Sequence, residues 1–230
     1  MRNARPATPV VIAALGLAVG FAHAGHAGAQ ADWRAPRVVA WECAACHGID
    51  GNAQLPTMPR LAAQKATYLQ AQIAAFRAAP PTSSIEIPPA LVPSPAVPAD
   101  ARTGPNARIY MIGPAHGLTV EDAKSASAWY AGQKPQPGPA GDPAQVARGR
   151  ELYAKGLPGT GASACQDCHG ADSAGLASFP RLAGQHASYL VRQLEAFASG
   201  HRASGSPMHG IARDLPPDDV DALAAYLQSL

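Results

Sequence analysis

The chain has 230 residues, 15% of them charged, and its 18 basic and 16 acidic residues give a formal net charge of +2. A net charge this small, with few charged residues, is not the basic pattern of a nucleic-acid-binding protein. The length is enough for one or two domains.

The first thirty residues have the pattern of a secretory signal peptide. Arg2 and Arg5 precede an apolar run at 10–21, and small residues follow up to Ala24 and Ala29. Twelve apolar residues fall short of the roughly 20 that span a bilayer, so a retained anchor is the weaker alternative. We predict a signal peptide over 1–29, cleaved after Ala24 or Ala29, and a periplasmic protein. Loss of the two arginines reduces the 18 basic residues to 16, which equals the 16 acidic ones.

All four cysteines lie in two pentads of the form Cys-x-x-Cys-His, residues 43–47 and 165–169, and glycine follows each pentad. This is the attachment signature of a c-type haem. Thiols three positions apart reach the two vinyl groups of one porphyrin, and the adjacent imidazole reaches the iron. We therefore predict two haem c groups. Their covalent anchors are Cys43, Cys46, Cys165 and Cys168, and their histidine ligands are His47 and His169.

Three other uses of the cysteines deserve comparison. A zinc site built from two cysteine pairs usually keeps the pairs within roughly 20 residues, whereas 118 residues separate these pairs. A thioredoxin-like dithiol needs a βαβ context, which the sequence lacks. A disulfide within a pentad closes a very short loop and stabilises little. None of the three explains the two histidines.

The sequence around the pentads is an internal repeat. Residues 59–62 match 180–183 at an offset of 121, and apolar residues at i, i+4 and i+7 follow in both copies. This spacing predicts one helix in each copy, ended by Pro80 and Pro81 in the first and by Gly200 in the second. The matching positions are Gln64, Tyr68, Leu69, Gln72, Ile73 and Phe76 in the first copy, and Gln185, Tyr189, Leu190, Gln193, Leu194 and Phe197 in the second.

The first copy has a proline-rich insert at 81–105, which predicts an extended loop. Either an inert surface loop or a partner-docking loop fits this insert.

Beyond the insert, Met111 matches Met208 at an offset of 97, and both precede a final helix. A thioether is a good ligand for haem iron, so we predict Met111 and Met208 as the sixth ligands. Met58 has no methionine counterpart and is expected to pack. The alternatives are histidine ligation, through His116 or His209, and an open iron position.

Capping residues predict the remaining helices. Thr119 to Asp122 opens a helix that runs to about Ala131, Pro143 opens the next, and Pro217 opens the last. Residues 133–141 read as a linker, and residues 155–164 as a glycine-rich insertion before the second pentad. His186 and His201, outside any motif, are expected on the surface. Each copy also places an arginine, Arg60 or Arg181, beside a proline; these are candidate contacts for a haem propionate.

The second copy, from Pro180-Arg-Leu-Ala-Gly-Gln-His-Ala-Ser-Tyr-Leu through Gly200-His-Arg and Met208 to the closing Leu-Ala-Ala-Tyr-Leu, resembles the two-domain di-haem class I cytochromes c of the c4 group. The first copy matches less closely, since Lys65 stands opposite His186. The resemblance implies an all-α fold of two tandem cytochrome c domains, 32–132 and 142–230, with haems meeting near the domain interface. It also implies that the Pro59 and Pro180 carbonyls accept hydrogen bonds from the iron-binding histidines.

From these residues we expect an electron-transfer protein rather than an enzyme, in which each iron cycles between ferric and ferrous. The expected partners are redox proteins: a terminal oxidase, a quinol-oxidising complex or a dehydrogenase. Nucleic acid is not an expected partner, and peripheral association with a membrane is expected only through these protein partners. The first alternative is a haem subunit of a periplasmic dehydrogenase complex oxidising a sulfur compound or an alcohol. The second is a haem enzyme such as a peroxidase, which needs an open iron position.

Overall fold

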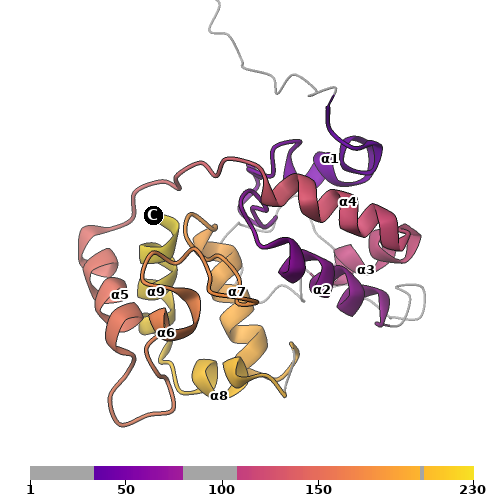
Figure 1. Ribbon diagram of the computed structural model, residues 1–230. Coiled ribbons are helices and arrows are strands. Elements are labelled where there is room, and N and C mark those ends of the chain that lie inside the picture. The colour runs from indigo at the N-terminus through magenta and orange to yellow at the C-terminus, as the bar shows by residue number, and fades with distance from the viewer. Residues whose placement is uncertain (1–33, 80–107, 203–204) are drawn as a thin grey trace, which may run out of the picture. The chain divides into compact units, whose positions relative to one another are not determined.

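A computed structural model describes residues 34–79, 108–202 and 205–230 (Figure 1). The predicted signal peptide 1–29 and the insert 81–105 lie outside this range. Within it every regular element is helical, as predicted. The elements are η1 (Val39–Cys43), α1 (Ala44–His47), α2 (Ala66–Arg77), α3 (Arg108–Gly117), α4 (Val120–Ala131), α5 (Pro143–Lys155), α6 (Gln166–His169), α7 (Ala187–Ala198), α8 (Pro207–Arg213) and α9 (Pro217–Gln228).

The first copy, η1 to α4, has its own core. The predicted cap of α4 is confirmed: the Thr119 side chain accepts from the Asp122 N–H at 3.0 Å, and the Asp122 carboxylate accepts from Thr119 in return. Helix α2 has the predicted position and packs against α3 and α4. The buried residues that form this core are Val38, Val39, Leu69, Leu118, Ala126 and Tyr130.

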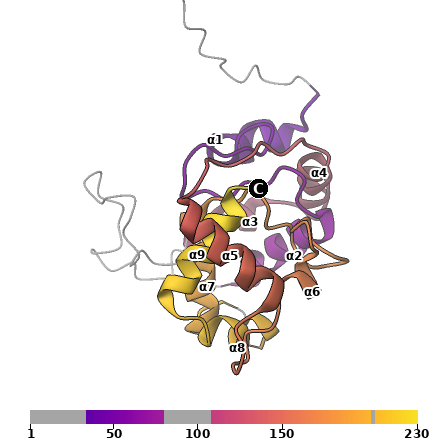
Figure 2. The same ribbon diagram turned by 90° about the vertical axis from the view of Figure 1, so that its left-hand side faces the viewer.

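The second copy, α5 to α9, has a larger core around the crossing of α5 and α9, which Figure 2 shows side by side. Asp142 caps α5, and Pro143 occupies its first turn, as predicted. The helices meet closely at Gly149, where a Cβ atom would lie only 2.0 Å from the Ala222 carbonyl oxygen. The buried residues of this core are Leu152, Tyr153, Leu190, Ala222, Leu223, Ala224, Tyr226 and Leu227.

Matching backbone hydrogen bonds confirm the repeat. The Gly51 carbonyl accepts from the Leu61 and Ala62 N–H groups, and the Ser173 carbonyl accepts from those of Leu182 and Ala183. Each copy then joins its middle loop to its last helix. Ala63 N–H donates to Tyr130 O at 3.0 Å, and Gly184 N–H donates to Leu227 O at 2.8 Å. The offsets of 121 and 97 residues therefore relate equivalent positions in space as well as in sequence.

The copies differ before their pentads. Helical backbone runs through η1 directly into α1, whereas the predicted glycine-rich loop separates α5 from α6. Gly156 starts this loop at φ +69, where a Cβ atom would approach the Ala162 carbonyl oxygen to 2.4 Å. Residues 133–142 carry no helix and connect the copies.

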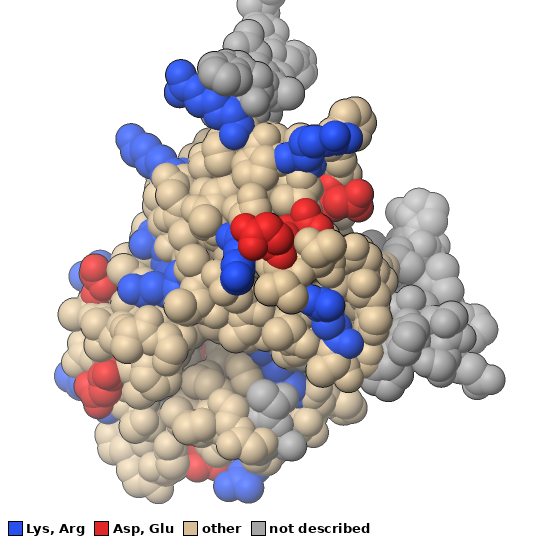
Figure 3. All heavy atoms as spheres, turned by 45° about the vertical axis from the view of Figure 1, so that its right-hand side comes forward, with Lys and Arg blue, Asp and Glu red and all other residues tan. Residues whose placement is uncertain are grey.

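Surface charge is sparse and mixed. On the face drawn in Figure 3, basic and acidic side chains are interspersed among uncharged residues that cover most of the area. This agrees with the balanced charge of the sequence. No helix within the described ranges is long and apolar enough to cross a bilayer.

Candidate haem sites

Each pentad ends in a buried histidine. In the first copy Cys43 closes the π-helical segment η1 and His47 ends α1; in the second, Cys165 precedes α6 and His169 ends it. The two imidazoles are 5% and 7% exposed. In both copies the next residue is glycine at positive φ, +76 and +81, which turns the chain sharply away from the pentad. The same local geometry is thus built twice.

The two histidines are oriented by the proline carbonyls that the resemblance implies. His47 Nδ1 donates to Pro59 O at 2.9 Å, and His169 Nδ1 donates to Pro180 O at 3.0 Å. The tautomer that donates from Nδ1 keeps the Nε2 lone pair available to a metal. Burial lowers the pKa of both imidazoles despite these hydrogen bonds, so both are neutral at physiological pH. A buried, neutral, fixed imidazole suits an axial haem ligand.

The thiols also fit covalent haem attachment. All four cysteines are free thiols in this structure. Burial raises the pKa of the Cys43 and Cys165 thiols from 9.0 to about 11. Within the described ranges no group of three or more His, Cys, Asp and Glu side chains could hold a metal ion. Two thiols beside one imidazole match the needs of one haem in each copy.

In each copy a buried tyrosine donates a hydrogen bond to the glycine after the pentad, a contact that the sequence did not predict. Tyr130 of α4 donates to Gly48 O at 3.1 Å, and Tyr153 of α5 donates to Gly170 O at 2.6 Å. The acceptors are equivalent glycines, but the donors come from the last helix of one copy and the first helix of the other. Equivalent turns are therefore stabilised by helices at different positions in the two copies.

Tyr153→Phe is expected to make alkaline unfolding less steep. Burial raises the pKa of Tyr153 to about 12 from its ordinary value of 10.0, so the unfolded chain releases this proton first. The resulting stability is fully present below pH 10 and is lost as pH rises toward 12. Phenylalanine lacks that proton, and losing the Gly170 hydrogen bond costs about 1 kcal/mol near pH 7.

Urea unfolding of the holoprotein from pH 7 to 12 measures this difference. Tyr110→Phe is the matched control, because Tyr110 is 48% exposed. If the free energy of unfolding fell equally steeply with pH above pH 10 in Tyr153→Phe and in the parent protein, the assignment would be contradicted.

The predicted methionine ligands occupy equivalent short helices. Met111 lies in the first turn of α3 and Met208 in the first turn of α8, where Ser206 caps the helix. α3 packs against α2, and α8 packs against α7. The alternative ligands are held differently: His116 Nδ1 donates within its own helix to Ile112 O, and His209 Nδ1 donates to Phe197 O. The methionines share a repeat position, and the histidines do not.

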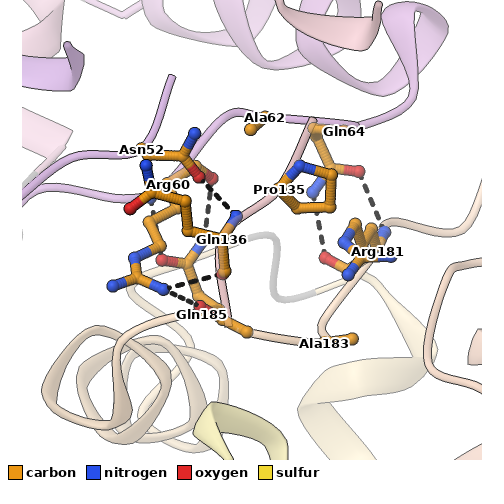
Figure 4. A pocket seen from close by; sticks show the side chains of 10 residues that line it. Asn52, Arg60, Ala62, Gln64, Pro135, Gln136, Arg181, Ala183 and Gln185 are labelled. Atoms are coloured by element: carbon orange, nitrogen blue, oxygen red, sulfur yellow. Dashed lines mark hydrogen bonds between the residues drawn. The ribbon is translucent and has the colours of Figure 1, made fainter. Parts of the chain in front are cut away.

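The candidate propionate contacts, Arg60 and Arg181, lie where the two copies meet (Figure 4). Arg60 Nη1 donates to the carbonyls of Gln136 and Gly184, and its buried Nε has no partner among the described residues. Burial lowers the pKa of both guanidinium groups. Both cations are thus partly removed from water, an arrangement that favours an anionic partner.

Two glutamines join the copies reciprocally. Gln64 Oε1 accepts from Arg181 N–H at 2.9 Å and Gln64 Nε2 donates to Arg181 O at 3.0 Å, and Gln185 makes the same two bonds, of the same lengths, to Arg60 (Figure 4). Each Oε1 also accepts from the next residue's N–H. The cavity beside them measures about 10 Å³, room for about one water. The contact is self-complementary, like that between subunits related by a twofold axis.

Three side chains at the start of and within α7 donate hydrogen bonds to backbone carbonyls of the first copy. His186 Nε2 donates to Ala53 O at 2.8 Å, Ser188 Oγ to Pro56 O at 2.7 Å and Arg192 Nη2 to Thr57 O at 3.1 Å. The expectation that His186 is a surface residue is therefore wrong, since it is 5% exposed. A loop from the other copy covers it. His201 is exposed, as predicted.

A cytochrome c family model matches residues 34–129 and 146–230. The chain belongs to the cytochrome c family. Cytochrome c4 of Stutzerimonas stutzeri is 33% identical over 226 residues, which cover 96% of this chain and 98% of that one. The solved structure of reduced recombinant cytochrome c4 from Pseudomonas stutzeri has a TM-score of 0.66 and 32% identity, covering 82% of this chain and 93% of that one. The chain is thus a di-haem member of the c4 group, an electron-transfer cytochrome with two haem c groups.

Other relatives bear names of sulfur metabolism. A thiosulfate dehydrogenase electron acceptor from Thiomonas intermedia (strain K12) is 31% identical over 206 residues, covering 86% of this chain and 83% of that one. A thiosulfate dehydrogenase from Marichromatium purpuratum has a TM-score of 0.63 and 32% identity, and the match covers 81% of this chain but 36% of that one. Cytochrome c4 proteins and electron acceptors of a dehydrogenase therefore share this architecture.

Proposed function

We propose that this c4-group cytochrome carries single electrons between periplasmic redox proteins through two His/Met-ligated haems. The observation that carries the proposal is the duplicated ligand frame. In each copy a buried neutral imidazole is fixed by a proline carbonyl, and a methionine lies on a helix packed against the same middle helix. The proposed ligand sets are His47 with Met111 and His169 with Met208. Export of the chain rests on the predicted signal peptide 1–29.

Each haem, when bound, supplies a one-electron ferric/ferrous couple. The residues of the chain keep that couple in place and set its potential. The Pro59 and Pro180 carbonyls fix the histidine rings and increase their basicity, and a methionine sulfur on the iron would favour the ferrous state. We further propose that Arg60 and Arg181 contact propionates. The partnerless, buried Nε of Arg60 and the lowered pKa of both groups support this role.

The proposed domains are 32–132 and 142–230, joined by the linker 133–141. Because His47 with Met111 and His169 with Met208 would each hold one iron, we propose a carrier and not an enzyme. Two centres in one chain let an electron enter at one domain and leave at the other. The insert 81–105 remains a candidate docking loop.

A second function has specific support. The similarity to thiosulfate dehydrogenase electron acceptors favours a dehydrogenase as the electron donor, bound either transiently or as a permanent partner. Native purification from the producing cells, with haem staining, distinguishes the two arrangements. A free carrier elutes as a single small haem protein, and a subunit brings a larger chain with it.

The carrier itself is tested with potentiometry and cyanide. We expect two one-electron transitions per chain and no tight cyanide binding by the oxidised protein. Tight cyanide binding at either haem would indicate an open iron position and would favour the haem enzyme instead.

A further inference from the structure

Arg202 is a buried arginine at the junction of the two copies. It is 7% exposed. Gly200, at φ +76, turns the chain after α7, and Arg202 N–H then donates to Ala196 O at 2.9 Å. This turn brings the guanidinium back over the end of α7. Its Cζ lies 4.5 Å from the centre of the Phe197 ring.

Among the described residues, the side chains that bind or stack on the Arg202 guanidinium are neutral. Nη1 donates to Gln193 Oε1 of α7, and Nη2 donates to Tyr68 Oη at 2.6 Å and to Gln72 Oε1 at 3.0 Å, both on α2 of the other copy. Among the described residues no Asp or Glu lies within 4.0 Å of its nitrogens. These acceptors bind the guanidinium without supplying a negative charge. The buried guanidinium charge acts strongly on nearby groups because little water screens it.

Phe197 links this charge to the second haem site. Its ring lies under the guanidinium, and its carbonyl accepts from His209 Nδ1 at 2.7 Å. His209 directly follows Met208, the proposed sulfur ligand. The equivalent position in the first copy is Pro81 rather than an arginine. Arg202 is therefore close in structure to the ligand helix α8 and has no counterpart in the first copy.

We propose that Arg202 raises the reduction potential of the haem bound at Cys165 and Cys168. A fixed, buried cation disfavours the ferric state, which carries one more positive charge than the ferrous state. The proposal rests on the proposed function, because it requires a redox-active second haem. It adds a charged residue outside the ligand set as the element that sets the potential.

Arg202→Gln tests the proposal, since it removes the charge and keeps a hydrogen-bond donor. We expect the reduction equilibrium of the second haem to shift about tenfold toward the ferric form, close to 59 mV for one electron. Arg202→Lys retains the charge and should shift it less than threefold. Gln72→Glu is isosteric and places a carboxylate opposite the cation, so it should also lower the potential of the second haem. This second variant tests the proposal if Arg202→Gln fails to fold.

Arg192→Gln is the matched control. Arg192 also reaches from α7 to the other copy, but its hydrogen bond to Thr57 O is exposed, so less than a threefold change is expected. Methyl-labelled methionine resolves the two haems by NMR, because only Met58, Met111 and Met208 lie beyond the signal peptide. Unchanged potentials in folded Arg202→Gln and Gln72→Glu would overturn the proposal. Absence of a shifted Met208 methyl signal in the parent protein would instead overturn the proposed ligation.

Discussion

Met208→Ala is expected to shift the reduction equilibrium of the second haem toward the ferric form by at least a hundredfold, roughly 120 mV at about 59 mV per tenfold. Removal of the sulfur leaves water or an added ligand on the iron. These oxygen or nitrogen donors favour ferric iron more than a thioether does. The variant should also lose the weak long-wavelength absorption of methionine-ligated ferric haem and gain affinity for cyanide. Spectroelectrochemical titration of both haems measures the change.

Met58→Ala provides the matched control for this loss. It removes the same side chain from a position where the other copy has Phe179, and we expect both potentials to stay within a threefold change. Met111→Ala should reproduce the Met208→Ala result at the first haem alone. An unaltered ferric spectrum in either ligand variant would show that the sixth ligand at that haem is a different residue.

Gln64→Ala combined with Gln185→Ala is expected to destabilise the protein by roughly 4 kcal/mol or more and to uncouple the two copies. The double variant removes both side chains of the reciprocal contact and leaves backbone groups of Arg60 and Arg181 without partners. Leaving a buried polar group unsatisfied costs about 1–3 kcal/mol. Since each copy has its own core, we expect one cooperative unfolding transition to become two.

Calorimetry of the holoprotein measures both effects. Gln145→Ala is the control, because Gln145 is an exposed residue on α5 and its loss should change stability by less than about 0.5 kcal/mol. The single variants should each destabilise the protein, and their effects should not add, because both residues belong to one contact. A single transition in the double variant, at the temperature of the parent protein, would falsify the proposed coupling.

Local signals in the sequence were sufficient for most of the helices. Thr119, Pro143 and Pro217 each start a helix where predicted, because capping depends on residues within one turn. The apolar residues spaced at i, i+4 and i+7 from Leu69 and from Leu190 likewise predicted α2 and α7. The π-helical segment η1 was not predicted, since its extra residue per turn leaves no recognisable pattern in five residues.

The candidate site was predictable where the repeat duplicated a signal. The pentads and the pairing of Met111 with Met208 could be found from spacing alone. His186 was misread because its burial depends on a loop of the other copy, more than 130 residues away in sequence. Gln64 and Gln185 were visible as matching positions, but their partners lie across the junction of the copies. The presence of glutamine at both positions was the one signal that could have pointed to a shared role.

The two tyrosines that fasten the pentad turns also affect the order in which the chain acquires structure. Tyr153 and Gly170 are 17 residues apart, whereas Tyr130 and Gly48 are 82 residues apart. Closing a longer loop costs more chain entropy and needs more of the polypeptide to be present. As the chain emerges from its amino end, the second turn can be secured by local contacts. We expect the first turn to be secured only after α4 has been made, because α4 supplies its tyrosine.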